Sequence, residues 1–360
     1  MYLYMEQKFL PMSQRPPLEG LPDALNGAST PEQWRARREE IKEILCHYML
    51  GHLPEKEFPV SGEVLSAREV YGGKGVREEI RLDIGRGESF EFYLVRPARE
   101  GRFPAIVWTY FVGRSDCPIG EELVDRGYVL AAFENNALCK DDKDNPVSPA
   151  KRVYPEADWG AILIWAWGFS KIADYLCAQN YVDAKKLICT GHSRNGKAAL
   201  IAGAMDERFQ VVAPNNSGCG GAGCLRYLGD TWHITQNSVE VETVGAVMDR
   251  FPHWFVPEFA DFGNLTPPYP IAHEDRLPLD AHFFRAMIAP RGVISIEGTE
   301  DLWANCYGSY LMRLAAQPVF ELYGVPGRNF QIIRNGPHGH THRGWHWMLD
   351  FAEEVFSGRI

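Results

Sequence analysis

The sequence lacks the features that mark membrane-spanning and nucleic-acid-binding chains. No stretch approaches the roughly 20 consecutive apolar residues that cross a bilayer, and residues 1–17 lack the basic segment, apolar segment and cleavage site of a secretory signal. Basic residues number 37 against 47 acidic ones, a net charge of −10 with no lysine- or arginine-rich run. Non-specific binding to nucleic acid or to a membrane is therefore not expected. We predict a cytoplasmic protein whose partner is a small molecule.

Cysteine is also sparse and shows no disulfide or metal-binding pattern. Eight cysteines are scattered over 360 residues, and none forms a C-x-x-C pair. We expect them to be buried thiols, neither a disulfide framework nor a zinc site. Apolar residues make up 45% of the chain and charged residues 23%, which is typical of a globular protein and excludes a fibrous or wholly disordered one.

The distribution of prolines, glycines and apolar runs indicates one domain behind a tail. Residues 1–28 are proline-rich and aperiodic, and no repeat, low-complexity tract or linker divides residues 29–360. Residues 225–285 are long, irregular and rich in aromatics and proline. Long irregular insertions in compact enzymes are commonly functional, so we predict that this segment is a binding wall or a lid.

The periodicity predicts an α/β fold. Thr30-Pro31-Glu32-Gln33 has the pattern of a capped helix start, and this helix should end at Gly51. Residues 60–98 alternate apolar and polar positions, as antiparallel strands with one solvated face do. Beyond Arg102, short apolar runs alternate with helical stretches, which indicates a mostly parallel sheet with helices on both faces. The predicted buried strands are 105–111, 128–133, 187–190, 211–213, 293–296 and 330–333, and the predicted helices are 162–179, 197–205, 306–316 and 345–356.

The strongest chemical motif is a G-x-S-x-x-G turn between a predicted strand and a predicted helix. Ser193 lies within residues 191–196, after an apolar strand and before an alanine-rich helix. A nucleophilic serine requires this context, because the tight turn exposes its hydroxyl above the helix N-terminus. The backbone N–H of Arg194 and the helix dipole would then meet a developing oxyanion. We predict that Ser193 is a nucleophile.

A serine nucleophile needs a base, and the base needs an acid that orients it. In the chain order of α/β-hydrolases, the acid follows a late strand and the histidine follows the last one. Asp301 and His338 occupy these places after the predicted strands 293–296 and 330–333. Glu297 and Glu300 compete with Asp301 for the role of the acid.

The same C-terminal loop offers a rival interpretation. His338, His340 and His342 alternate along it, and His346 follows, so the loop could begin a zinc site. No H-E-x-x-H motif accompanies them, and metal catalysis would leave the serine turn unexplained. We therefore predict no metal and no other cofactor, with His340, His342 and His346 capping or packing around the last helix.

Taken together, these motifs resemble the family 15 carbohydrate esterases, the glucuronoyl esterases of the α/β-hydrolase superfamily. Ser-Arg-Asn-Gly-Lys at 193–197 is unusual among serine hydrolases and typical of that family. The resemblance implies that the Arg194 side chain also binds the oxyanion, that Lys197 binds sugar hydroxyls and that Trp303 lines the uronate pocket. Trp254 is a weaker candidate of the same kind. The matching stretches are 191–197, 217–222, 251–255, 277–282, 288–291, 301–305 and 336–338, and residues 30–54 are similar as well.

The chain departs from the family pattern at several positions. Many members carry a glutamate as the triad acid at the position of Asn216, and an amide cannot replace a carboxylate there. This shifts the acid role to Asp301. Secreted fungal members have a disulfide at the positions of His192 and Gly339, and its absence agrees with a reducing compartment. The family's sugar-binding Gln and Glu have no clear counterpart, although Gln236 and Glu242 lie in the right region.

The sequence thus predicts a serine esterase that acts on a carbohydrate ester. The favoured bond is an ester of (4-O-methyl)glucuronic acid, cleaved through an acyl-enzyme on Ser193. An acetyl (xylan) esterase or sugar deacetylase of the same fold is the second possibility, in which the sugar supplies the alcohol. An inactive homologue that binds glycans is the third.

Overall fold

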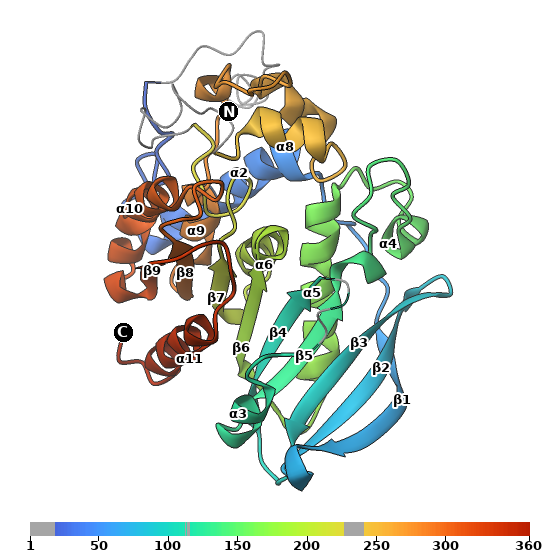
Figure 1. Ribbon diagram of the computed structural model, residues 1–360. Helices are drawn as coiled ribbons and strands as arrows, with labels where there is room; N and C mark the ends of the chain where they lie inside the picture. The colour runs from blue at the N-terminus through green and yellow to red at the C-terminus, as the bar shows by residue number, and fades with distance from the viewer. Residues whose placement is uncertain (1–18, 112, 114–115, 227–240) are drawn as a thin grey trace.

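A nine-stranded sheet organises the chain (Figure 1). The computed structural model describes residues 19–111, 113, 116–226 and 241–360. The strand order is β1-β2-β3-β5-β4-β6-β7-β8-β9; β1, β2 and β3 pair antiparallel, β3 also pairs antiparallel with β5, and the strands from β5 to β9 are parallel. Their bounds are β1 Ser61–Val70, β2 Gly75–Gly85, β3 Glu88–Pro97, β4 Phe103–Tyr110, β5 Val129–Glu134, β6 Val182–His192, β7 Phe209–Asn215, β8 Gly292–Gly298 and β9 Asn329–Arg334.

Helices cover both faces of the parallel part, as predicted. Along β4, Ala105 and Val107 join the larger core with α2, α5, α6, α9 and α10, whereas Ile106 and Trp108 face α3 and α11. Alternation on a strand buried on both sides produces the continuous apolar runs of the sequence. The bounds are α2 Pro31–Leu45, α3 Gly120–Asp125, α4 Pro149–Val153, α5 Ala161–Cys177, α6 Arg194–Met205, α8 Val244–Arg250, α9 His282–Ile288, α10 Cys306–Leu322 and α11 His342–Phe356.

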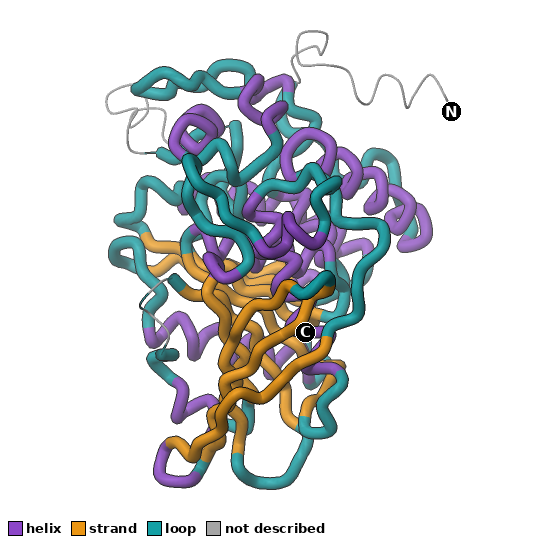
Figure 2. The backbone as a smooth tube through the Cα atoms, turned by 90° about the vertical axis from the view of Figure 1, so that its right-hand side faces the viewer, coloured by secondary structure: helices purple, strands orange, loops and turns teal. Residues whose placement is uncertain are grey.

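The antiparallel strands form a separate edge of the molecule. Figure 2 shows the strands gathered in the lower part and most helices and loops in the upper part. Strand β1 is exposed along nearly its whole length, while Ile80, Leu82 and Ile84 of β2 are fully buried. The alternation in β2 therefore marks one buried face, as predicted. The prediction fails for its neighbours: β1 is exposed on both faces, and residues 92–95 of β3 are buried on both.

The first described helix begins and ends where the sequence indicates. Thr30 caps α2 by accepting a hydrogen bond from the backbone N–H of Gln33 at 3.3 Å, and the Gln33 side chain accepts one from the N–H of Ser29 at 2.8 Å. The helix continues as one π-helical turn, Cys46–Leu50, and ends at Gly51. A Cβ on Gly51 would lie 2.5 Å from the Trp159 Cα, so this ending requires glycine.

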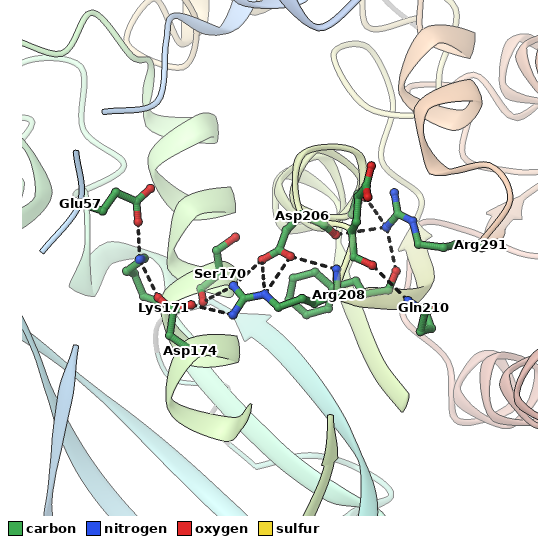
Figure 3. A network of polar contacts seen from close by, with 11 residues as sticks. Glu57, Ser170, Lys171, Asp174, Asp206, Arg208, Gln210 and Arg291 are labelled. Atoms are coloured by element: carbon green, nitrogen blue, oxygen red, sulfur yellow. Dashed lines mark hydrogen bonds and ion pairs between the residues drawn. The ribbon is translucent and has the colours of Figure 1, made fainter. Parts of the chain in front are cut away.

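An ionic network fastens the helices at the end of the sheet where the parallel strands begin (Figure 3). Lys171 of α5 pairs with Glu57 and with Asp174, and Arg208 joins Asp174 to Asp206. Nearby, the Arg291 guanidinium donates to three backbone carbonyls around the α6–β7 connection. These contacts join α5, α6 and the start of β8.

The predicted wall segment is packed into the domain as far as it is described. Its described part contains α8, two short 3₁₀ helices, Pro257–Phe262 and Glu274–Arg276, and the beginning of α9. Phe255 and Phe259 of this segment lie in the larger core. Residues 227–240 of this segment and residues 1–18 of the predicted tail lie outside the described residues. All eight cysteines are free thiols, as expected, but not all are buried: Cys117, Cys177 and Cys306 are only partly buried. Among the described helices, none is long and apolar enough to cross a membrane.

Close packing of α6 against β7 predicts that Gly203→Ala destabilises the protein. A Cβ at this position would lie 2.2 Å from a methyl group of Val212, and such overpacking costs about 1–3 kcal/mol. Chemical denaturation should show this loss, although alanine is the better helix former. Gly327→Ala is the matched control, because its Cβ would meet only the Ile360 side chain at 3.3 Å. Equal stability of Gly203→Ala and the wild type would contradict the packing.

Candidate active site

Ser193 occupies a strained turn between β6 and α6. Its backbone has φ 60° and ψ −129°, outside the usual range of residues with a side chain. The Ser193 N–H is held by the Asn215 carbonyl at 2.9 Å. A Cβ on Gly191 would lie 2.2 Å from the Asn195 carbonyl oxygen. The glycine before Ser193 therefore permits the turn to close, as the motif predicts.

His338 and Asp301 meet at the ends of the last two strands. The Nδ1 atom of His338 lies 2.5 Å from Oδ2 of Asp301. The Asp301 side chain is 3% exposed and that of His338 is 39% exposed, so the acid is enclosed and the imidazole reaches solvent. Burial alone would raise the pKa of Asp301, but hydrogen bonds from His338 and Asn216 and the charge of His338 lower it. The carboxylate is therefore ionised beside the imidazole.

The structure separates Asp301 from the two glutamates that compete with it in the sequence. Glu300 is exposed. Glu297 is fully buried and accepts a hydrogen bond from Ser309 at 3.2 Å; burial and the nearby Asp301 raise its pKa to about 8. A carboxyl group that is protonated at neutral pH cannot stabilise an imidazolium. Asp301 is the acid that contacts His338.

Asn216 contacts Asp301, the residue to which the sequence assigns the role of the acid. Its Nδ2 donates to Oδ2 of Asp301 at 2.7 Å, and its backbone N–H donates to the Ile296 carbonyl at 3.0 Å. Its backbone has φ 45°, a conformation that asparagine tolerates better than most residues. The amide and the histidine thus donate to the same carboxylate oxygen.

Ser193 and His338 open into one small cavity of about 130 Å³. A larger cavity of about 420 Å³ lies beside it, with Phe111, His192 and His340 in its wall. The His192 ring is 4.3 Å from the His338 ring, so the two cavities are neighbours. The small cavity is lined by Ser193, Arg194, Lys197, Asn216, Ser217, Glu242, Arg250, Phe251, Trp254, Trp303, Ala304 and His338.

Arg194 lines the cavity, and its side chain is held by an ion pair. As the first residue of α6, it has no carbonyl one turn earlier to accept from its N–H. Its guanidinium pairs with Asp141 and lies 4.9 Å from the Trp254 ring centre. Burial opposes ionisation of Asp141, but hydrogen bonds from His253 and Trp254 and the Arg194 charge lower its pKa to about 2. Sequence reasoning missed Asp141, which lies in an irregular loop without periodicity.

Lys197 is buried, and its three ammonium donors are all used by the protein. They contact the carbonyls of Ser217 and Cys219 at 2.7 and 2.6 Å and Oε2 of Glu242 at 2.7 Å. An ammonium group has three N–H donors. The expectation that Lys197 binds sugar hydroxyls directly is therefore corrected: the residue that it holds at the cavity wall is Glu242. Gln236 lies outside the described residues.

The two predicted tryptophans differ in what they offer a ligand. Trp303 is partly exposed, and the Arg250 guanidinium lies 4.8 Å from its ring centre. Trp254 is only 2% exposed, stacks on Phe251 at 3.9 Å and donates its indole N–H to Asp141. Trp254 therefore packs against the Arg194 guanidinium and binds its partner Asp141. Trp303 is the more exposed of the two tryptophans at the cavity. Arg250, which sequence reasoning did not single out, ends α8 at the same cavity.

The histidines of the C-terminal loop do not gather on one face. His340 is partly buried and stacks on Trp345 at 4.6 Å; desolvation, with His192 and Arg334 nearby, lowers its pKa to about 3. His342 and His346 instead contact Glu122 of α3. The alternating site of His338, His340 and His342 that a metal interpretation requires is therefore not formed. Thr341 caps α11.

Comparison with known proteins connects this geometry to one family. A model of the family described as fungal glucuronyl esterase matches residues 83–324. Carbohydrate esterase MZ0003, from an unknown prokaryotic organism, is 27% identical over 94% of this chain and 90% of its own length. The 4-O-methyl-glucuronoyl methylesterase of Schizophyllum commune is 29% identical over 92% and 79%. The solved glucuronoyl esterase from Solibacter usitatus has a TM-score of 0.80 at 26% identity, over 96% of this chain and 100% of that one.

The raised pKa of Glu297 predicts a specific dependence of stability on pH. Since its folded pKa is about 8 and a free carboxyl titrates near 4.3, the folded state binds the extra proton between these values. The free energy of unfolding therefore falls as the pH rises from about 4.3 toward 8, because the folded state must give up this proton. The loss from Glu297 is at most roughly 5 kcal/mol, and none of it is present at low pH. Glu297→Gln should remove this loss. We expect the stability of the variant relative to wild type to increase between about pH 5 and pH 9, measured by urea unfolding. Parallel curves over this range would contradict the assignment.

Proposed function

Because this chain belongs to the glucuronoyl esterase family, a family of carboxylic ester hydrolases with the α/β-hydrolase fold, we propose that it hydrolyses esters of (4-O-methyl)glucuronic acid through an acyl-enzyme on Ser193. The observation that carries the proposal is the ionised Asp301 against His338, whose ring opens into the cavity that holds Ser193. The relatives from Schizophyllum commune and Podospora anserina are named for the same ester.

The reaction follows from the positions of these three residues. The Ser193 hydroxyl attacks the ester carbonyl while His338 takes its proton, and Asp301 stabilises the resulting imidazolium. The oxyanion accepts from the Arg194 backbone N–H near the positive end of α6. Collapse expels the alcohol, which receives the proton from His338. Water, deprotonated by His338, then attacks the acyl-enzyme, and collapse releases the uronate and returns the proton to Ser193.

The wall of the cavity supports a uronate as the acyl half. The Arg250 guanidinium lies beside Trp303 at the cavity, and positive charge suits a product that leaves as a carboxylate. The face of Trp303 offers a flat apolar surface for a sugar ring. Glu242 lines the same cavity, and a carboxylate can accept a hydrogen bond from a sugar hydroxyl. The alcohol half would extend toward the larger cavity beside His192.

We expect a preference for uronate esters that depends on the three residues. Initial rates on methyl or benzyl glucuronate should exceed those on an acetylated sugar. Ser193→Ala should lower kcat by roughly 10⁶-fold through loss of the nucleophile, and Asp301→Asn by roughly 10⁴-fold through loss of the stabilised imidazolium. Glu300→Gln, one residue before Asp301 and exposed, is the matched control and should leave both rates unchanged.

The other outcomes separate the remaining hypotheses. A Ser193-dependent preference for acetyl esters would retain the three residues and overturn the uronate assignment. Absence of turnover on both ester classes, with binding of glucuronate-bearing oligosaccharides, would identify an inactive homologue.

Asn216 is proposed as a positioning residue for the acid. Asn216→Ala removes the 2.7 Å hydrogen bond to Asp301, and a hydrogen bond to a charged group contributes about 1.5–3 kcal/mol. We expect kcat on methyl glucuronate to fall at least about tenfold, with KM changed less than twofold, because the substrate does not depend on the amide for binding. A rise in KM at constant kcat would show that Asn216 acts on the substrate instead.

A further inference from the structure

Two histidines on α11 and a glutamate on α3 form a cluster that the esterase chemistry does not use. His342 Nε2 lies 2.7 Å from Oε1 of Glu122, and His346 Nε2 lies 2.9 Å from Oε2 of the same carboxylate. The histidines are four residues apart, so they share one face of the helix. Their ring centres are 4.8 Å apart, and the donor atoms of all three residues lie within 4.8 Å of one another.

The chemistry of this cluster is that of a transition-metal ligand set. Two imidazoles and one carboxylate leave the fourth position of a tetrahedral Zn²⁺ site for water. Ligand atoms at about 2 Å from Zn²⁺ are separated by roughly 3.3 Å, so the present spacings need only small side-chain adjustments. The three side chains are 33–56% exposed, and an ion can therefore reach them from solvent.

The surroundings suit a structural site rather than a catalytic one. The cluster joins the first turn of α11 to α3, and Arg126, the residue that follows α3, reinforces the same contact by pairing with Asp350 and Glu353 at 3.2 and 2.5 Å. Four residues before His342 lies His338, at the proposed reaction centre, which faces Asp301 instead. A bond between α11 and α3 would therefore hold the end of the loop that carries His338.

We propose that Glu122, His342 and His346 bind one divalent transition-metal ion of the Zn²⁺ type, which fastens α11 to α3. The imidazole nitrogens select against Mg²⁺ and Ca²⁺, which prefer oxygen ligands. The ion takes no part in ester cleavage. The proposal is independent of the substrate, since it concerns binding at a different place in the chain.

The test is metal binding by the tag-free, full-length protein after dialysis against a chelator. Calorimetric titration with Zn²⁺ should show one site per chain with micromolar or tighter affinity, and Zn²⁺ should raise the unfolding temperature. Bound Co²⁺ should give the visible absorption of a tetrahedral ion. Mg²⁺ should displace neither Zn²⁺ nor Co²⁺ from the protein. His342→Gln, His346→Gln and Glu122→Gln should each weaken Zn²⁺ binding by more than roughly tenfold.

His52→Gln is the matched control. His52 is similarly exposed and lies between Asp158 and Glu43, at 2.9 and 3.4 Å, outside the cluster of Glu122. The His52→Gln variant should bind Zn²⁺ with the same affinity as the wild type. Absence of binding to the wild type at millimolar Zn²⁺, or equal binding by the wild type and all three cluster variants, would overturn the proposal and leave a hydrogen-bonded contact between two helices. Because these readouts are binding and unfolding, their failure is distinguishable from failure of the proposed esterase activity.

Discussion

The sharp turn from β6 into α6 is the constraint on which the rest of the site depends. Ser193 can adopt φ 60° only because Gly191 lets the turn close against Asn195 and the Asn215 carbonyl holds the Ser193 N–H. Strands β6, β7, β8 and β9 are neighbours in the sheet, and each delivers one residue to the same edge: in this order Ser193, Asn216, Asp301 and His338. The chemistry is therefore assembled by parallel strands ending together, with side chains that lie far apart in the sequence.

Two residues, Asp301 and Asn216, together determine the ionised acid of this site. A second carboxylate in place of Asn216 would lie within hydrogen-bond distance of Asp301, and two carboxylates that close cannot both be ionised. An amide removes this conflict and supplies a donor, which lowers the pKa of Asp301 together with His338. Asparagine at this position is thus the consequence of placing the acid after β8. The neighbouring Glu297, with its raised pKa, adds no competing charge at neutral pH.

Local patterns predicted the strands, the long helices and the serine turn, because each depends on residues within a few positions of one another. Alternating burial along β4 and the capped start at Thr30 are examples. Helix α3 was missed because Gly120–Asp125 is too short to show a periodic pattern. The partners of Lys197 and Arg194 could not be predicted either. Glu242 is 45 residues from Lys197 and Asp141 is 53 residues from Arg194, and no local spacing encodes such contacts.

These long-range pairs explain how the cavity keeps its shape. A buried lysine is costly unless its donors are satisfied, and Lys197 meets this requirement with two carbonyls of the glycine-rich turn and Glu242. The turn can approach so closely because a Cβ on Gly218 would lie 2.2 Å from Oε2 of Glu242. One ammonium group thus fixes two parts of the chain relative to α6: the turn after β7, and the residues of the wall segment just before α8. Because α6 begins at the Ser193 turn, the wall is positioned relative to the proposed nucleophile before a ligand binds. Ligand binding then loses less conformational entropy than it would if the wall had to become ordered at that moment.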